Sequence, residues 1–338
     1  MRVVVIGATG NIGTSVVRAL AADPQVEQIV GVARRLPDLY VPKTTFVAAD
    51  VRTSALEPLL ADADALVQLA WAFQPTHRPI ETWEVNVLGT LRVLQAAANV
   101  GVPTIAYASS VGAYSPAPGD TVDESWPTHS LPTAAYGREK AYLERVLDTF
   151  EMRHPELRVV RIRPSFVFQR EAASEQARVF AGPLLPRWVT RPGALPVIPL
   201  PTGLRFQAVH AADLAEAFRL LLHAADARGA YNVASEPIID RATIGGLLGA
   251  RTVPVPQRLA RWAVGAAWRV HVSRSDAELL RLFLSLPTLD TTKIRGELGW
   301  APKHSGPAAL AELFEGIAEG AGAATAPLHE PTGPVTVG

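Results

Sequence analysis

The chain has 338 residues, of which 48% are hydrophobic, and its 32 basic and 32 acidic residues give a formal net charge of zero. This balance, without a basic cluster, argues against nucleic acid or an anionic membrane surface as a partner, and the lack of cysteine excludes disulfides, thiolate metal sites and cysteine nucleophiles. Because we find no charged leader, no metal-ligand spacing and no apolar run of the roughly 18 residues that a membrane span needs, we expect a cytoplasmic protein without a metal.

The first stretch of the chain joins a strand pattern to a helix pattern through a glycine-rich turn. The apolar run Val3–Ile6 leads into Gly7-Ala-Thr-Gly-Asn-Ile-Gly13, and apolar residues then recur at helical spacing over Asn11–Ala22. Glycines at this spacing allow a tight turn, close approach of a pyrophosphate and close helix–sheet packing. A dinucleotide phosphate would bind at the helix N-terminus, where free N–H groups and the helix dipole favour an anion. We therefore predict cofactor contacts from Gly7, Thr9, Gly10, Asn11, Ile12 and Gly13.

Farther along, short β-branched runs alternate with helical patterns. The predicted strands are Val3–Ile6, Gln28–Ala33, Thr45–Ala48, Ala65–Leu69, Thr104–Ala108 and Arg158–Arg161, and the clearest further helices are Thr82–Ala98 and Ala134–Arg153. Strands that are apolar throughout belong in a parallel sheet covered on both faces by helices. The fold class is therefore α/β, with a doubly wound parallel sheet that binds ligands beyond the carboxyl ends of its strands.

The second half of the chain changes composition and suggests a smaller C-terminal substrate lobe. We assign residues 1–168 to the cofactor-binding domain, with 204–235 completing its sheet, and residues 169–203 and 236–317 to the lobe. A helix over 258–271, with Leu259 and Trp262, is expected to form lobe core. The alanine- and glycine-rich residues 318–338 are expected to be a flexible tail.

The end of the second predicted strand indicates which cofactor is used. Arg34 and Arg35 stand where an NAD-binding fold typically has an acidic residue, and two guanidinium groups would attract the 2′-phosphate of NADP. We predict NADP, with NAD as the second choice. Asp50 and Val51 follow the third strand and are expected beside the adenine.

The loop after the fourth strand and the end of the fifth strand carry the candidate reactive groups. Leu69, Ala70, Trp71 and Phe73 are expected to form the wall of the pocket. Tyr136 and Lys140 lie at i and i+4 of a helix, so both side chains can reach one spot, where the ammonium would lower the phenol pKa. Such a phenol can exchange a proton with a substrate oxygen, which a serine at the end of the fifth strand could hold.

These features together resemble the extended short-chain dehydrogenases/reductases, in the group named for NAD-dependent epimerases and dehydratases, which have a Rossmann-like fold. The resemblance spans nearly the whole chain. Its marks are the glycine turn, Asp50-Val51, Asn86-Val-Leu-Gly-Thr, the serine-bearing strand end, Tyr136-x-x-x-Lys140, Arg163-Pro164, Val209-His-Ala-Ala-Asp213, Tyr231-Asn-Val-Ala and Glu297-Leu-Gly-Trp300.

The resemblance implies roles for particular residues. It selects Ser110 over Ser109 as the catalytic hydroxyl, beside Tyr136 and Lys140. Further cofactor contacts are expected from Asn86, Ala108 and Pro164, and substrate contacts from Phe73, Ser110, Val111 and Arg205, the last on a diphosphate. It also implies a homodimer through the helices Thr82–Ala98 and Ala134–Arg153, with Leu88, Val93, Tyr142 and Val146 facing outward.

Departures from the family pattern indicate which reaction the protein catalyses on its small-molecule substrate. Val111 and Gly112 replace the acidic pair with which the sugar-nucleotide dehydratases eliminate water, and Arg34 replaces the aspartate with which 4-epimerases usually hold NAD. We therefore expect NADPH-dependent reduction of a carbonyl, or the reverse alcohol oxidation. A sugar-nucleotide epimerase with retained NAD and a non-catalytic NADP-binding regulator stay as alternatives.

Overall fold

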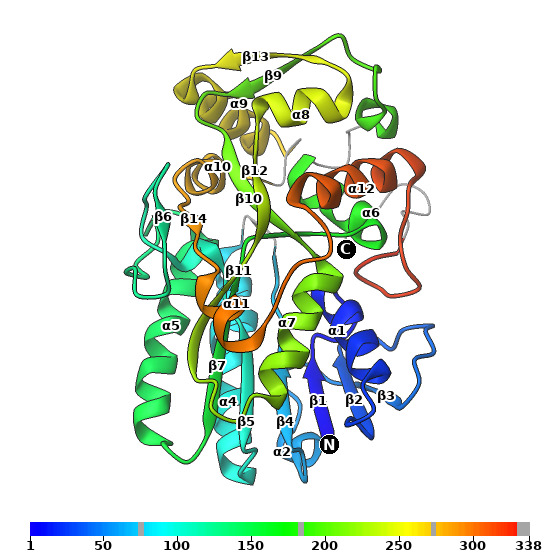
Figure 1. Cartoon of the computed structure of the whole chain (residues 1–338), viewed down its shortest axis with the longest axis vertical. Coiled ribbons are helices and arrows are strands. Elements are labelled where there is room, and N and C mark those ends of the chain that lie inside the picture. Colours follow the sequence, from blue (N-terminus) through cyan, green and yellow to red (C-terminus); the bar gives the residue numbers. More distant parts are fainter. Residues whose placement is uncertain (74–77, 182–185, 272–274, 330–338) are drawn as a thin grey trace.

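The computed structural model describes residues 1–73, 78–181, 186–271 and 275–329. Its centre is a parallel sheet in the order β11-β7-β5-β4-β1-β2-β3 (Figure 1). These strands are β1 (Arg2–Ile6), β2 (Gln28–Ala33), β3 (Thr44–Ala48), β4 (Ala65–Gln68), β5 (Thr104–Ala108), β7 (Arg158–Pro164) and β11 (Gly229–Val233). The order reverses at β1, so the carboxyl ends of β1 and β4 flank the crevice where such sheets bind ligands. The predicted Rossmann-like α/β fold is confirmed.

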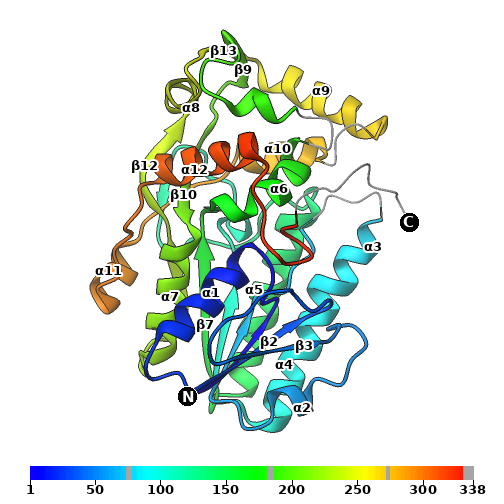
Figure 2. The same ribbon diagram turned by 90° about the vertical axis from the view of Figure 1, so that its right-hand side faces the viewer.

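Helices cover both faces of this sheet, which explains why its strands are apolar on both sides. Helices α1 (Asn11–Ala22) and α7 (Ala211–His223) share one core with β1 and β7, which contains Val5, Leu20 and Phe218. On the other face, α2 (Glu57–Leu60), α4 (Gly89–Val100) and α5 (Ala135–Arg153) share a core that contains Leu66 and Leu143. Figure 2 shows the sheet nearly edge-on between these layers.

The helix predicted over Thr82–Ala98 forms as three consecutive pieces. They are α3 (Pro79–Thr82), a π-helical stretch (Trp83–Leu88) and α4. Of the outward residues predicted for a dimer, Leu88 and Tyr142 are 45% and 43% exposed. Val93 is wrong as a contact residue, because it is completely buried inside the chain. The homodimer itself stays a prediction.

The segment predicted to complete the main sheet does so only in part. Strand β11 joins the main sheet, but β10 (Arg205–His210) pairs with β8 (Phe166–Phe168) and β12 (Ser235–Asp240) in a separate three-stranded sheet. The other elements are β6 (Thr121–Val122), β9 (Val197–Pro201), β13 (Arg251–Val255), β14 (Thr288–Leu289), α6 (Ala173–Gln176), α8 (Arg241–Leu248), α9 (Gln257–Arg269), α10 (Ala277–Phe283), α11 (Thr292–Leu298) and α12 (Gly306–Glu319).

Two further expectations are wrong. Helix α9, assigned to the lobe core, has no buried residue, because it lies on the outside of α10 and β9 and presents much of its surface to solvent. The first part of the predicted tail packs on the protein. Helix α12 extends to Glu319, and Thr325 and Leu328 are only 2% and 0% exposed. Residues 330–338 of the predicted tail lie outside the described residues.

Within the described ranges, the longest apolar helices fall short of what crossing a bilayer requires. The same residues also contain no cluster of three or more potential metal ligands.

Candidate active site

The glycine turn after β1 is shaped by close backbone contacts. Gly7 has φ +88°, and a Cβ there would lie 2.6 Å from the backbone nitrogen of Ala70 in the loop after β4. A Cβ on Gly13 would lie 2.1 Å from the carbonyl oxygen of Gly7. Both distances are far below contact, so these positions require glycine for close packing of α1 and the β4 loop against the turn.

Helix α1 leaves its N-terminus open toward solvent. Its N-cap residue Gly10 provides no side-chain hydrogen bond, and the first turn contains no acidic residue. A Cβ on Gly10 would meet only the Gly7 carbonyl oxygen at 3.7 Å, so space remains in front of the turn. Unpaired N–H groups and the positive end of the dipole therefore face a volume that a pyrophosphate can fill. The residues present fit the phosphates of a dinucleotide.

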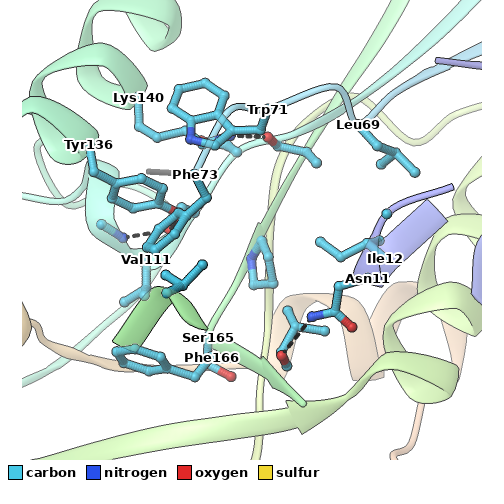
Figure 3. A pocket seen from close by; sticks show the side chains of 18 of the residues that line it. Asn11, Ile12, Leu69, Trp71, Phe73, Val111, Tyr136, Lys140, Ser165 and Phe166 are labelled. Carbon is cyan, nitrogen blue, oxygen red and sulfur yellow. Dashed lines mark hydrogen bonds between the residues drawn. The ribbon is translucent and has the colours of Figure 1, made fainter. Parts of the chain in front are cut away.

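Beside this turn lies an inner cavity of about 220 Å³, which Figure 3 shows from close by. Gly7, Asn11 and Ile12 border it on one side, and Ser110, Tyr136 and Lys140 on the other. The predicted residues Leu69, Trp71, Phe73, Ala108, Val111 and Pro164 also line it, together with Gly10 and Gly13. The structure thus brings the predicted serine, tyrosine and lysine to the same cavity as the glycine turn.

The serine and tyrosine are in direct contact. The Tyr136 hydroxyl donates to Ser110 Oγ at 2.8 Å, and the backbone N–H of Gly112 donates to the same oxygen at 3.0 Å. Because a hydroxyl oxygen has two lone pairs and one proton, Ser110 keeps its own proton for a third group. Trp71 and Phe73 pack edge-on against the Tyr136 ring at 5.7 and 4.7 Å between centroids. These contacts fix the phenol at the cavity wall.

Lys140 is held one helical turn beyond Tyr136. Its ammonium donates to the Ala108 carbonyl oxygen at 2.7 Å and lies 3.5 Å from the centroid of the Trp71 ring. Burial lowers the pKa of Lys140 to about 7, and the nearby carboxylates Glu144 and Glu139 oppose that fall. Two of the three ammonium donors stay available for a ligand.

The expected effect of Lys140 on the phenol is wrong for this arrangement. Burial raises the pKa of Tyr136 to about 12, and only the hydrogen bond with Ser110 lowers it. Desolvation raises this pKa, and Lys140 is not among the groups that lower it; its ammonium points to Ala108 and Trp71 rather than to the phenolic oxygen. At neutral pH the protein therefore presents a protonated phenol to the cavity.

A buried ionic network lies behind the site. Glu144 is fully buried, and its carboxylate accepts from Arg163 at 2.7 and 3.0 Å and from Arg161 at 3.2 Å. Ser109 Oγ donates to the same carboxylate at 2.5 Å. Both serines line the cavity, but the Ser109 hydroxyl is bound by the network, while the Ser110 hydroxyl is bound to Tyr136. The network ties the end of β5 to α5 and β7, the elements that carry Ser110 and Tyr136.

A second, outer cavity of about 570 Å³ continues from the glycine turn past the ends of β2 and β3. Thr9, Arg34, Arg35, Asp50, Val51 and Ala70 line it, as predicted for the adenosine half of a dinucleotide. Both arginines are exposed at its rim. The Asp50 carboxylate is bound by Arg52, which holds the pKa of that carboxyl below its usual value.

Two residues, one predicted to contact the cofactor and one the substrate, do not line either cavity. Asn86 borders neither the inner nor the outer cavity, because its amide accepts from the Ala72 N–H at 2.6 Å and donates to the buried carboxylate of Glu139 at 2.7 Å. It joins the β4 loop to α5 and so supports Tyr136 indirectly. Arg205 also lines neither cavity, and its guanidinium lies 3.5 Å from the Gly119 carbonyl oxygen. A diphosphate contact from Arg205 stays a prediction.

Several cavity residues were missed from the sequence. Ser165 and Gln176 line the inner cavity, and Ser165 Oγ and Gln176 Oε1 are buried without a hydrogen-bond partner in the described chain. Ser165 directly follows the recognised Arg163-Pro164 pair, which could have indicated it. Phe283 and Leu286 enter from a distant part of the chain, and no local pattern predicts that.

Glu175 is another missed residue, and it lines both cavities. Burial raises the pKa of Glu175 to about 7, against the attraction of Arg178. A carboxyl that is partly protonated at neutral pH repels a phosphate less than an ionised one does. Its presence therefore does not oppose an anionic ligand at the glycine turn.

Comparison with known proteins agrees with this fold. The family described as "NAD dependent epimerase/dehydratase family" matches residues 3–234. An uncharacterized protein of Mycobacterium tuberculosis is 27% identical over 305 residues, which are 89% of this chain but 28% of that protein. The chain thus spans under a third of the length of that relative. A 4-epimerase of N-acetyl-alpha-D-glucosaminyl-diphospho-ditrans,octacis-undecaprenol from Escherichia coli O157:H7 is 32% identical over 169 residues, 49% of each chain.

Solved structures share the fold. MoeE5 in complex with UDP-glucuronic acid and NAD is 22% identical, with a TM-score of 0.69 over 94% of this chain and 99% of that one. UDP-glucose 4-epimerase of Thermus thermophilus in complex with NAD is 21% identical, with a TM-score of 0.67 over 94% and 99%. At such identities the likeness establishes the fold alone.

The parallel sheet, the open glycine turn and the Ser110–Tyr136–Lys140 group define an extended short-chain dehydrogenase/reductase. Since the family match covers more than half of its residues, the chain belongs to the NAD-dependent epimerase/dehydratase family.

Proposed function

We propose that the protein reduces the carbonyl group of an apolar small molecule with NADPH, or catalyses the reverse alcohol oxidation. The observation that supports this most is the protonated Tyr136 phenol, in contact with Ser110, at the wall of a cavity whose other side is the glycine turn. The cavity is lined mainly by apolar side chains, among them Val111, Phe166 and Phe283, and no arginine of the described chain borders it. This lining suits an uncharged carbonyl compound better than a diphosphate.

The side chains can assist this reaction in defined ways. The cofactor, bound along the glycine turn, supplies the hydride. Ser110 donates its own O–H to the carbonyl oxygen, and Tyr136 gives that oxygen its proton once the phenolic O–H turns from Ser110 to the substrate. The Tyr136 phenol, with its pKa raised to about 12, is protonated at neutral pH, so the proton that the reducing direction requires is present. Lys140 has free donors for the cofactor ribose and stays near the phenol through its bond to Ala108.

A panel of apolar ketones and aldehydes tests this function. The parent protein should oxidise NADPH in proportion to the added carbonyl compound and release the corresponding alcohol. Absence of NADPH oxidation with every compound, together with tight NADPH binding, would favour the non-catalytic regulator.

We also propose NADP over NAD, because Arg34 and Arg35 border the outer cavity where the adenosine ribose would lie. Arg34→Asp should reverse the preference, since it replaces an attractive charge with a repulsive one. One charged hydrogen bond contributes roughly 1.5 to 3 kcal/mol, on the order of tenfold to a hundredfold in affinity. Calorimetric titration with both cofactors measures this, and equal affinities in the parent protein would contradict it.

The tail contributes to the same site. Thr325 Oγ1 donates to the carbonyl oxygen of Thr9 in the glycine turn at 2.9 Å, and Ala326 and Pro327 line the outer cavity. Thr325→Val keeps the volume but removes a buried bond, so NADPH affinity should fall roughly fivefold, the equivalent of about 1 kcal/mol. The control is Thr149→Val, whose hydroxyl bonds within its own helix far along the chain. Unchanged affinity in Thr325→Val would show that the tail does not shape the turn.

A sugar-nucleotide epimerase with retained NAD is the second candidate. The observation in its favour is the 32% identity with a sugar 4-epimerase across 169 residues, which are 49% of the chain. Such an enzyme would interconvert two alcohols without net change in cofactor absorbance. The two candidates therefore differ in whether added cofactor is consumed.

A further inference from the structure

Helix α9 exposes an apolar stripe that nothing in the described chain covers. Leu259, Trp262 and Val270 are 54%, 69% and 68% exposed. Leu259, Trp262, Ala263 and Ala266 recur at i, i+3, i+4 and i+7, so they lie along one side of the helix, and Val270 follows directly as its C-cap residue. A tryptophan and two aliphatic residues in one exposed stripe indicate a surface that binds a partner.

The opposite side of α9 packs on the protein. Arg261 pairs with Glu278 of α10 at 2.9 Å, and a Cβ on Gly265 would contact Ala277 at 3.5 Å. Trp268 borders a cavity of about 420 Å³ that Tyr136 and Phe73 also line. The helix is therefore anchored beside the candidate active site, and the stripe points away from it. Figures 1 and 2 both place α9 at the end of the molecule opposite the N-terminus.

The charge on α9 selects among possible partners. Its sequence, QRLARWAVGAAWR, contains three arginines and no acidic residue. Arg258 and Arg269 are exposed, and neither forms an ion pair with another described residue. In a two-fold contact between copies, these arginines would approach the like-charged helix of the second copy with no carboxylate on either helix to pair with. A second copy is therefore a poor partner for this stripe.

We propose that α9 lies in the surface of an anionic lipid bilayer, with Leu259, Trp262 and Val270 in the headgroup region and Arg258 and Arg269 on lipid phosphates. An amphipathic helix with tryptophan and leucine on one face and arginine beside them has the composition of such interfacial helices. Each basic residue near an anionic surface adds attraction. The zero net charge of the whole chain does not indicate this feature, because the feature comes from the arginines of a single helix. Docking in this way places the candidate active site near the lipid surface, and it does not depend on which reaction the site performs.

Vesicle sedimentation with the full chain tests the proposal. We expect the protein to sediment with vesicles of phosphatidylcholine and phosphatidylglycerol at about 3:1, and roughly tenfold more weakly with phosphatidylcholine alone. Trp262→Ser should lower partitioning to the anionic vesicles roughly tenfold, and the double change Arg258→Gln with Arg269→Gln should remove the preference for them. Trp188→Ser, at another tryptophan that is 49% exposed, is the matched control and should bind like the parent.

These variants all alter exposed side chains, so their thermal unfolding should match that of the parent. No sedimentation with either vesicle would overturn the proposal, as would equal binding by Trp262→Ser and the parent. Light scattering measures whether the stripe joins two copies of the chain. A parent dimer that becomes a monomer in Trp262→Ser would overturn the proposal, because a second copy rather than lipid would then cover the stripe.

Discussion

Tyr136→Phe should lower the turnover of NADPH-dependent reduction by roughly a hundredfold to ten-thousandfold, the range typical for loss of a general acid. The change removes the hydroxyl that donates to Ser110 at 2.8 Å and leaves the ring, which Trp71 and Phe73 hold in place. NADPH affinity should change little, because the ring still fills the same wall of the cavity. Steady-state kinetics with a reactive carbonyl compound, together with calorimetric titration of the cofactor, measure both quantities.

Tyr142→Phe is the matched control for this prediction. Tyr142 lies on the same helix α5, is 43% exposed and packs against Trp83 on the outside of the molecule. The Tyr142→Phe protein should reduce the substrate at the parent rate. A Tyr136→Phe protein as active as the parent would show that another group gives the proton.

Glu144→Gln should lower the free energy of unfolding by roughly 3 to 5 kcal/mol, as expected when one member of a buried ionic network is neutralised. Arg163 would then keep a buried charge that faces an amide in place of the carboxylate, while Arg161 would keep its pairs with Asp148 and Glu151. Denaturant unfolding measures this loss. Glu151→Gln is the control, because Glu151 binds Arg161 from a position that is 32% exposed, and it should cost at most about 1 kcal/mol.

The same substitution should also change the pH dependence of activity. The Glu144 carboxylate raises the pKa of Lys140 against the effect of burial, so its removal should lower that pKa below about 7. If the ammonium form is the active one, the fall of activity with rising pH should begin at lower pH in Glu144→Gln than in the parent. Unchanged stability and an unchanged pH profile would together contradict the assigned role of the network.

The sequence predicted those parts of the molecule that depend on local pattern. The glycine turn, the apolar strands and the Tyr136–Lys140 spacing each follow from short-range rules, and the main sheet follows from the alternation of strands and helices. Their convergence on one cavity was predictable because the carboxyl ends of parallel strands lie at one edge of a sheet. The resemblance to a family added the choice of Ser110.

The errors concern interactions that only tertiary structure decides. β10 lies within the segment assigned to the main sheet, but its partners are β8 and β12. The high pKa of Tyr136 depends on burial and on the direction of the Lys140 ammonium, neither of which residue spacing reveals. The tail has a composition typical of flexible segments, yet Leu328 is completely buried and Thr325 bonds to the glycine turn. Helix α9 has the pattern of a core helix, and only its exposure identifies an outward stripe.

Transfer of deuterium from the cofactor tests the central claim most directly. NADPH carrying deuterium at both hydrogens of the nicotinamide C4 is incubated with the protein and an apolar carbonyl compound, and the products are examined by mass spectrometry. Our account predicts one deuterium on the carbinol carbon of the alcohol for each NADPH oxidised, and roughly a hundredfold to ten-thousandfold less labelled alcohol with Tyr136→Phe over the same time. An alcohol without deuterium, or interconversion of two alcohols with no oxidation of the added NADPH, would contradict it.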